Sequence, residues 1–253
     1  MAPPPPPAVT AVVSVATLQP DISPGELVSI MGTNLSTPPI TSQYDGSGLY
    51  PTLLGNTKVT FNGTPAPLLY VSTGQVDAVV PYGVAGANSL NVIVTHYGVA
   101  SPAFSIPLVD TSPGICIASQ SCSKEGGILN AASRSLNMVT PNNAEIPAPK
   151  GSAITIFATG AGLWKRSVPD GSVVLNAFPP SVPFSLAPAA PVSLTIGGLP
   201  ATILYAGSAP FKVSGVLQVN AVVPDGVDSG PQPVVLTIGE RNNSQQQLTV
   251  AVQ

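Results

Sequence analysis

The chain carries nearly the same ten-residue stretch twice, and this repeat is the strongest constraint on its fold. QVDAVVPYGV occupies residues 75–84 and QVNAVVPDGV occupies residues 218–227, with eight of the ten positions identical. The similarity extends towards the N-terminus, where KVTFNGTPAPLLYVS (58–72) aligns with SLTIGGLPATILYAG (193–207). Self-similarity over such a length predicts two copies of one folding unit, each able to bury its own core.

The repeat sets the expected domain organisation. The predicted parts are a proline-rich arm at 1–8, a first domain at 9–110, a linker with a cysteine pair at 111–127 and a second domain at 128–253. Eight extra residues in the region SAPFKVSGVL separate the two matched blocks of the second copy.

The distribution of proline and glycine predicts that each unit is all-β. Thirty prolines and 24 glycines among 253 residues argue against long helices. The segments between them are rich in Val, Thr and Ile and alternate in polarity, so that Val59 and Phe61 share one face. About seven short strands with turns every 8–12 residues predict a sandwich of two packed sheets. No amphipathic helix of four turns is present to connect parallel strands, which excludes a parallel α/β sheet.

The repeated decapeptide itself reads as a central or covered strand. Alternate residues from Val76 to Val80 point to one face, while Gln75 and Asp77 point to the other. Pro81 then ends the strand or places it at an edge. The two polar side chains need partners, for which backbone groups of the preceding turn are candidates. We interpret the decapeptide as a packing motif and not as a binding motif.

Charge is scarce, and this excludes several classes of partner. Charged residues make up 8 % of the chain, against about 25 % in a typical globular protein, and the net charge is −3. No basic stretch is available for nucleic acid. Membrane insertion is not expected either, because no apolar run approaches the roughly 18 residues that cross a bilayer. The start MAPPPPP does not resemble a signal peptide, so we expect a mature form, a trimmed chain or the end of a longer one.

The sequence offers no group that predicts catalysis, a cofactor or a metal. Its single histidine, His96, stands next to a glycine-containing turn and is expected to be a solvated turn residue. No nucleophile elbow, zinc-protease motif, phosphate-binding loop or calcium loop is found. We therefore expect a protein that is not an enzyme.

Two cysteines lie close together in CIASQSC, as Cys116 and Cys122. A disulfide closing this small loop is the prediction for an oxidising compartment, and a pair of reduced thiols is the alternative. Two thiolates without nearby histidines fall short of a zinc site.

Two long loops follow equivalent strands and carry most of the aromatic residues outside the strands. They span residues 32–55 and 162–191. Exposed aromatic rings on loops stack on sugars or anchor protein partners, and the alternative is that they cover the ends of the sandwiches. The candidate contact residues are Tyr44 and Tyr50 in the first loop and Trp164, Phe178 and Phe184 in the second.

The ordered motifs resemble a known family. ISPGELVSIMGTNLS followed by KVTFNGTPAPLLYVSTGQVDAVVPYGVAG, and GSAITIFATGAGL followed by VSLTIGGLPATILYAG and LQVNAVVPDGV, are similar to the C-terminal domain family of Solibacter-type acidobacteria. The resemblance runs from about Val12 to Val252 and implies two tandem immunoglobulin-like (IPT/TIG-like) β-sandwich domains. It also implies a place at the ends of large secreted or surface proteins and no established activity of the module. The sequence departs from the family pattern at PGICIASQSC and at the proline-rich start.

These observations lead to one functional expectation and one alternative. Few charges on the surface leave sheet edges without a common protection against pairing. We therefore expect a non-catalytic structural protein, extracellular or at the cell surface, that assembles with copies of itself through sheet edges or loops into a fibre, sheath or layer. The alternative is a carbohydrate- or protein-binding accessory module of a larger secreted enzyme or adhesin. The proline-rich arm would dock on a neighbour in the first case, or serve as a stiff linker before the protein's own first strand.

Overall fold

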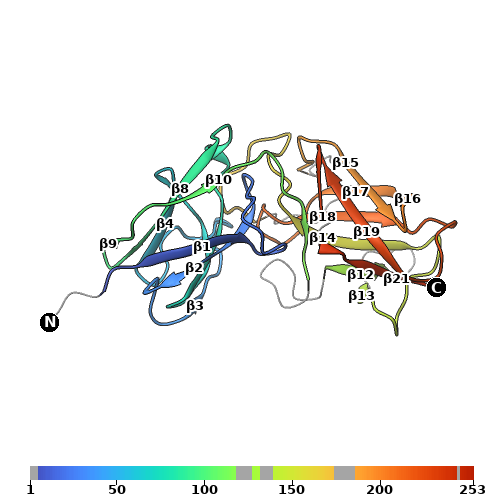
Figure 1. The fold of residues 1–253 in the computed structure, drawn as a ribbon, viewed down its shortest axis with the longest axis horizontal. Coiled ribbons are helices and arrows are strands. Elements are labelled where there is room, and N and C mark those ends of the chain that lie inside the picture. Colours follow the sequence, from blue (N-terminus) through green and yellow to red (C-terminus); the bar gives the residue numbers. More distant parts are fainter. Residues whose placement is uncertain (1–4, 118–126, 132–138, 174–185, 244–245) are drawn as a thin grey trace.

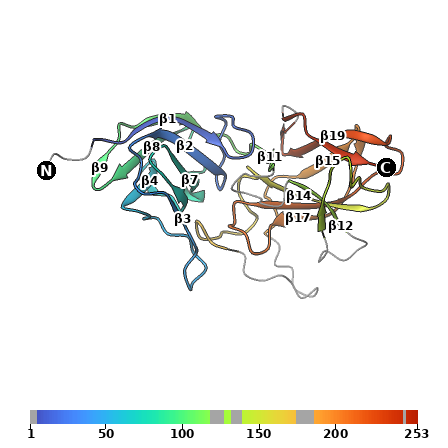
Figure 2. The same ribbon diagram turned by 90° about the horizontal axis from the view of Figure 1, so that it is seen from below.

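The computed structural model describes residues 5–117, 127–131, 139–173, 186–243 and 246–253. They form two β-sandwiches that lie side by side along the long axis, with the two termini at opposite ends (Figures 1 and 2). The fold is all-β and consists of two tandem immunoglobulin-like units, as the sequence predicts. The one helical element among the described residues is a short 3₁₀ turn, η1 (Tyr82–Val84). No helix in these ranges has the length and apolar character that would carry it through a bilayer.

The first unit consists of two antiparallel sheets. One sheet has the order β1 (Ala8–Ser14), β2 (Leu27–Thr33), β7 (Gln75–Val79), β6 (Leu68–Val71) and β3 (Ile40–Thr41). The other has the order β10 (Phe104–Pro107), β8 (Ser89–His96), β4 (Thr57–Phe61) and β5 (Thr64–Pro65), and β9 (Val99–Ala100) pairs with β8.

The second unit repeats the central strand order of both sheets and adds β11 and β13 to the first sheet. Its first sheet has the order β13 (Val139–Pro141), β12 (Ile128–Ala131), β14 (Ala153–Thr159), β18 (Leu217–Val222) and β17 (Thr202–Ser208), and β11 (Gly114–Ile115) pairs with β14. Its second sheet has the order β16 (Leu199–Pro200), β15 (Val192–Ile196), β19 (Gly230–Ile238) and β20 (Arg241–Asn242), and β21 (Thr249–Val252) pairs with β19. A register shift falls at equivalent places in both units, between Leu68 and Tyr70 and between Ile203 and Tyr205.

Strand β11 falls within the segment that the sequence assigns to a linker. Its residue Ile115 is fully buried in the core of the second unit. The hydroxyl of Thr111 also donates a hydrogen bond to the carbonyl oxygen of Ile238, at 2.9 Å. The beginning of this segment therefore packs as part of the second sandwich.

Each sandwich has its own apolar core, which is built from the alternate, inward-facing residues of its strands. In the first unit Val28 and Ile30 of β2 face Phe61 of β4 and Val92 of β8, all with 0 % exposure. Fully burying one such side chain contributes on the order of 1.5–3 kcal/mol. Burial of the alternate apolar residues that the sequence displays thus holds the two sheets together.

The decapeptide is the central strand of its sheet in both copies, as predicted. β7 lies between β2 and β6 and ends at Val79, while β18 lies between β14 and β17 and ends at Val222. Each of these strands stops two residues before a proline, at Pro81 and Pro224.

The polar residues of this strand hydrogen bond with side chains of the same strand and of the neighbouring strand. Asp77 Oδ1 accepts hydrogen bonds from Ser29 Oγ and Gln75 Nε2, both at 2.7 Å. In the second copy Asn220 Oδ1 accepts from Thr155 Oγ1 at 3.0 Å and from Gln218 Nε2 at 3.1 Å. The covered side of the sheet thus keeps one polar network in both units, because its buried amide and carboxyl groups require partners.

The position of His96 also differs from the expectation. His96 is the last residue of β8 and is buried, with its Nδ1 3.0 Å from Thr57 Oγ1. The Thr57 hydroxyl donates to the carbonyl oxygen of Leu35, so His96 Nδ1 carries the proton in this pair. Burial lowers the pKa of His96, which favours the neutral ring. His96 is therefore a packed core-edge residue and not a solvated turn residue.

Replacing Asn220 by Leu should lower the free energy of unfolding by about 1–3 kcal/mol, because the buried donors of Thr155 and Gln218 lose their acceptor. Asn91→Leu provides the control, since Asn91 is an exposed strand residue. Urea unfolding of both variants measures the difference. Equal stability of the two variants would contradict a structural role for the network.

Candidate functional site: the junction between the two units

A third apolar cluster lies between the two sandwiches. Leu27 and Val79 contribute from the outer face of the first sheet of the first unit. The second unit contributes from the loop between β17 and β18, which contains the eight-residue insertion of the second copy. The buried members of this cluster are Val15, Leu27, Val79, Cys116, Ala209, Val213 and Val216. A shared apolar cluster makes separation of the units unfavourable, since separation would expose these residues to water.

The backbones of the two units approach very closely at this cluster. A Cβ atom placed on Gly215 would lie 2.2 Å from the carbonyl oxygen of Gly25, which no side chain tolerates. The Thr159 hydroxyl links the two units at this point. It accepts a hydrogen bond from the Leu27 amide of the first unit and donates one to the Gly215 carbonyl of the second, each at 3.0 Å.

Tyr82 forms a second contact across the junction. Its amide donates to Asp170 Oδ1 at 2.7 Å, and its phenolic oxygen accepts from Trp164 Nε1 at 2.7 Å. The Tyr82 hydroxyl also lies 3.4 Å from Ser214 Oγ. Burial raises the pKa of Tyr82 to about 12, so the phenol remains protonated at every physiological pH. Asp225, which occupies the equivalent position of the second decapeptide, is exposed.

The two long loops meet each other at the same junction. Tyr50 donates its amide hydrogen to the Gly171 carbonyl at 3.0 Å, and Val173 donates to the Gly48 carbonyl at 2.8 Å. Leu49 and Ser172 form an isolated antiparallel bridge between these two bonds. The loops that follow equivalent strands thus bind one another.

The candidate contact residues lie in different environments. Tyr44 is 44 % exposed, and its ring meets that of Tyr50 edge-on with 6.0 Å between centroids. Trp164 is only 7 % exposed and belongs to the core of the second unit. Phe178 and Phe184 lie outside the described residues.

Cys116 is buried in the junction cluster, with 1 % exposure. Its expected partner, Cys122, lies outside the described residues, so the disulfide stays a prediction.

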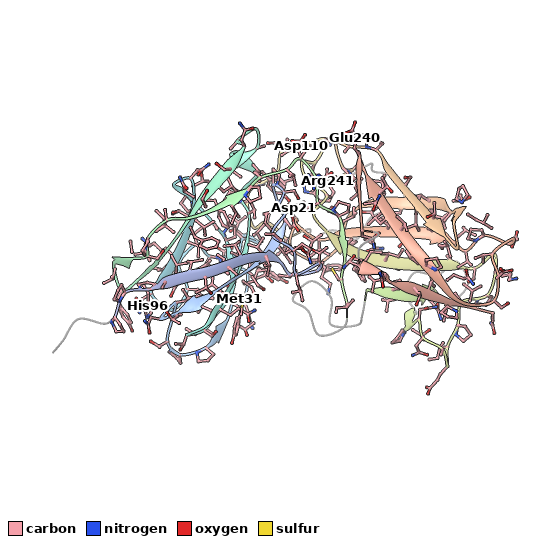
Figure 3. All side chains as sticks on the ribbon, in the orientation of Figure 1. Asp21, Met31, His96, Asp110, Glu240 and Arg241 are labelled. Carbon is pink, nitrogen blue, oxygen red and sulfur yellow. The ribbon has the colours of Figure 1, made fainter. Side chains whose placement is uncertain are left out.

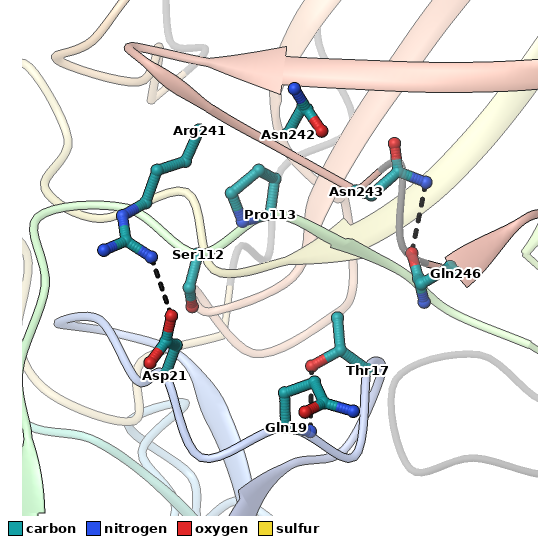
Figure 4. A pocket seen from close by; sticks show the side chains of 9 residues that line it. All are labelled: Thr17, Gln19, Asp21, Ser112, Pro113, Arg241, Asn242, Asn243 and Gln246. Atoms are coloured by element: carbon teal, nitrogen blue, oxygen red, sulfur yellow. Dashed lines mark hydrogen bonds and ion pairs between the residues drawn. The ribbon is translucent and has the colours of Figure 1, made fainter.

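A small polar pocket opens beside the junction, with a volume of about 180 Å³ (Figure 4). The first unit contributes Thr17, Gln19 and Asp21, while the hairpin of β19 and β20 contributes Arg241. Arg241 Nη1 lies 2.8 Å from Asp21 Oδ2, and both side chains are about half exposed. An exposed pair of this kind is worth about 0–1 kcal/mol, so it adds little to the stability of the junction.

The chemistry of the described residues is that of packing and polar contacts. Within these ranges no group of three His, Cys, Asp or Glu side chains could hold a metal ion. Figure 3 places His96 far from Asp21, Asp110, Glu240 and Arg241, which lie near the junction. The hydroxyl groups that meet an imidazole or a carboxylate, such as Thr57 beside His96, do so in buried hydrogen bonds.

Sequence reasoning missed the residues that form the junction. Tyr82 had a detectable signal, since it is one of the two positions at which the decapeptides differ. Gly215 lies in the eight-residue insertion, whose location was visible although its role was not. Thr159 left no signal, because an ordinary strand context surrounds it.

Tyr82→Phe should lower the free energy of unfolding by about 1–3 kcal/mol, because the buried Trp164 Nε1 loses its acceptor. Tyr97→Phe removes the same hydroxyl from a ring that is 58 % exposed and should change stability very little. Chemical denaturation followed by tryptophan fluorescence compares the two. A loss in the Tyr97 variant as large as that in the Tyr82 variant would refute the assignment.

Gly215→Ala should destabilise the protein by about 1–3 kcal/mol and separate the units, because the new methyl group overlaps the Gly25 carbonyl. The matched variant is Gly46→Ala, whose Cβ would have no atom within 4 Å. Thermal unfolding and small-angle X-ray scattering record both effects. An unchanged scattering profile and melting temperature in Gly215→Ala would contradict the close approach.

Comparison with known sequences identifies the first unit and finds nothing for the whole chain. Residues 13–106 match the IPT/TIG domain, and this range extends from β1 to β10. No curated protein matches the chain. The narrower resemblance to the acidobacterial family is not tested by these matches.

Several solved structures are similar in fold, and three of them are given as examples. The full extracellular region of plexin A4 is 11 % identical, with 98 % of this chain and 16 % of that chain covered and a TM-score of 0.31. SGBP-B of the Bacteroides ovatus mixed-linkage glucan utilization locus, in complex with a mixed-linkage heptasaccharide, is 13 % identical, with 93 % of this chain and 44 % of that chain covered and a TM-score of 0.35. Gamma-CGTase from alkalophilic Bacillus clarkii is 12 % identical, with 100 % of this chain and 28 % of that chain covered and a TM-score of 0.29. The chain spans less than half the length of each, and at these scores the similarity carries no conclusion about function. The family match gives the first unit an IPT/TIG-like immunoglobulin fold, and the second unit repeats its strand order.

Proposed function

We propose that this chain is a non-catalytic extracellular structural protein whose tandem immunoglobulin-like domains assemble with further copies of the chain. We propose the domain bounds that the repeat predicts, 9–110 and 128–253, with the start of the connecting segment packed on the second domain. IPT/TIG domains are generally non-catalytic modules, which agrees with a role in contact and spacing.

The observation that carries the proposal is the combination of a buried junction with a surface that has few charges. Both units meet in a buried cluster, and the termini lie at opposite ends of the long axis (Figure 1). Such a body can transmit its orientation from one end to the other, as an assembling subunit requires.

The surface supports the proposal because several large apolar side chains remain exposed. Charged residues number 19 in 253, so few of them are available to separate apolar groups from a neighbouring copy. Two exposed residues, Tyr44 and Leu53, belong to the loop that extends beyond the sheets after β3 (Figure 2). We propose this loop as a contact between copies. Other exposed apolar residues include Leu18, Leu204 and Phe211.

A second candidate function is a binding module for carbohydrate, and the Tyr44–Tyr50 pair favours it. The exposed Tyr44 ring, braced by an edge-on neighbour, has the geometry of an aromatic platform for a sugar face. In that case the chain would act as an accessory domain of a larger secreted enzyme or adhesin. Trp164 is a poor platform, because its ring is buried.

Light scattering over increasing protein concentration tests the assembly. The natural chain should grow in mean size, and Tyr44→Ser should reduce this growth, because it removes an exposed aromatic contact. Tyr97→Ser, which alters another exposed tyrosine at a hairpin turn, should leave the growth unchanged. A monodisperse monomer at all concentrations would overturn the proposal, and glycan binding lost in Tyr44→Ser would establish the second candidate.

A further inference from the structure

Glu26 is a fully buried carboxyl group at the junction between the units. Its Oε2 accepts hydrogen bonds from Ser23 N at 2.8 Å, from Ser23 Oγ at 3.0 Å and from Ser112 Oγ. Its Oε1 has no hydrogen-bond partner among the described residues, although it too is buried. An ionised carboxylate with one oxygen unpaired in such a site is strongly disfavoured.

The residues around Glu26 connect the two units. Ser112 is held by the second unit, because its amide donates to the Gly160 carbonyl at 2.9 Å. On either side of Glu26, the Gly25 carbonyl faces Gly215, and the Leu27 amide donates to Thr159. A change of charge on this carboxyl therefore occurs where the backbones of the units meet.

No cation compensates a charge on Glu26 among the described residues. Arg241 pairs with Asp21, and the ammonium of Lys212 lies over the Phe157 ring at 5.8 Å from its centroid. Asp110 is exposed, and Tyr82 hydrogen bonds with Asp170, Trp164 and Ser214. The titratable or charged groups on the surrounding elements are Asp21 on the same loop, Asp77 on β7, Tyr82 after β7 with Asp170 beside it, Asp110 on the connecting segment, Lys212 in the β17–β18 loop, and Glu240 and Arg241 in the β19–β20 hairpin.

We propose that the junction is a proton-dependent latch, closed while the Glu26 carboxyl is protonated and loosened when it ionises. Opening of the junction brings water to the carboxylate and removes the burial that opposes its charge. The two units then lose the contacts that residues 25–27 make with the second sandwich.

The expected pH range follows from the burial of the group. Burial raises the pKa of Glu26 from 4.5 to about 7, while the hydroxyls of Ser112, Ser14 and Ser23 lower it to a smaller extent. In an opened junction the pKa returns towards its ordinary value, so the closed state binds the proton more tightly. The stabilisation of the closed state is therefore complete below pH 4.5 and is lost as the pH rises through 7. The closed-to-open ratio should change by a factor on the order of 10² over this whole range.

Hydrogen exchange at the Leu27 amide measures how often the junction opens in the full chain. Its protection should fall on the order of tenfold between pH 5.5 and 8, relative to the Val94 amide. Val94 is a matched reference, because its amide also donates to a side-chain hydroxyl, that of Ser101, but within the first unit. Protection of Leu27 that stays in a constant ratio to that of Val94 across this range would overturn the proposal.

Two substitutions identify the carboxyl responsible. Glu26→Gln cannot ionise and should hold the Leu27-to-Val94 ratio constant with pH, whereas Glu145→Gln makes the same change on an exposed loop and should preserve the natural pH dependence. A pH dependence that persists in Glu26→Gln would refute the latch.

Ser112→Ala supplies a result that a merely structural role would not produce. It removes a hydrogen bond to the ionised form, so the midpoint of the loosening should move to higher pH. If Glu26→Gln fails to fold, this midpoint and an NMR titration of the Glu26 carboxyl in the natural chain decide the matter. A carboxyl that titrates below pH 6, or a midpoint that does not rise in Ser112→Ala, would overturn the proposal.

Discussion

The close packing of residues 25–27 against the second sandwich is the contact on which the whole arrangement depends. Without it the chain would be two immunoglobulin-like domains joined by a linker, each stable through its own core. The Gly215 position permits backbone contact, and the Leu27 side chain enters a cluster that both units share. While this contact is closed, the two domains form one elongated body.

The two copies have kept what each needs internally and have diverged where they meet. The inner faces of β2, β7, β14 and β18 carry small aliphatic residues in both units, and the polar network on the outer face is also repeated. Tyr82 and the β17–β18 insertion each occur in one copy only. The contact between the domains thus includes residues in which the two copies differ.

Much of the fold could be predicted from the sequence, because it depends on local periodicity and on turn residues. The alternation at Val59 and Phe61, the central position of the decapeptide strand and the stop before Pro81 were all readable. His96 was wrongly expected in a solvated turn, because the Thr57 partner that satisfies its ring comes from another strand, 39 residues away. The junction was unpredictable for the same reason: Thr159 contacts Leu27 across 132 residues, and no local pattern marks a contact of that range.

The near identity of the two central strands has a consequence for how the chain reaches its native state. β7 and β18 present almost the same edges and share a glutamine, although Asp77 of β7 is replaced by Asn220 in β18, so either strand resembles the partner that β14 or β2 requires. Tandem repeats of this kind are exposed to exchange of strands between domains during folding. Tyr82 follows β7 and has no counterpart after β18, and its hydrogen bond with Trp164 belongs to the native pairing. The asymmetry that joins the domains thus also favours the native pairing of their strands.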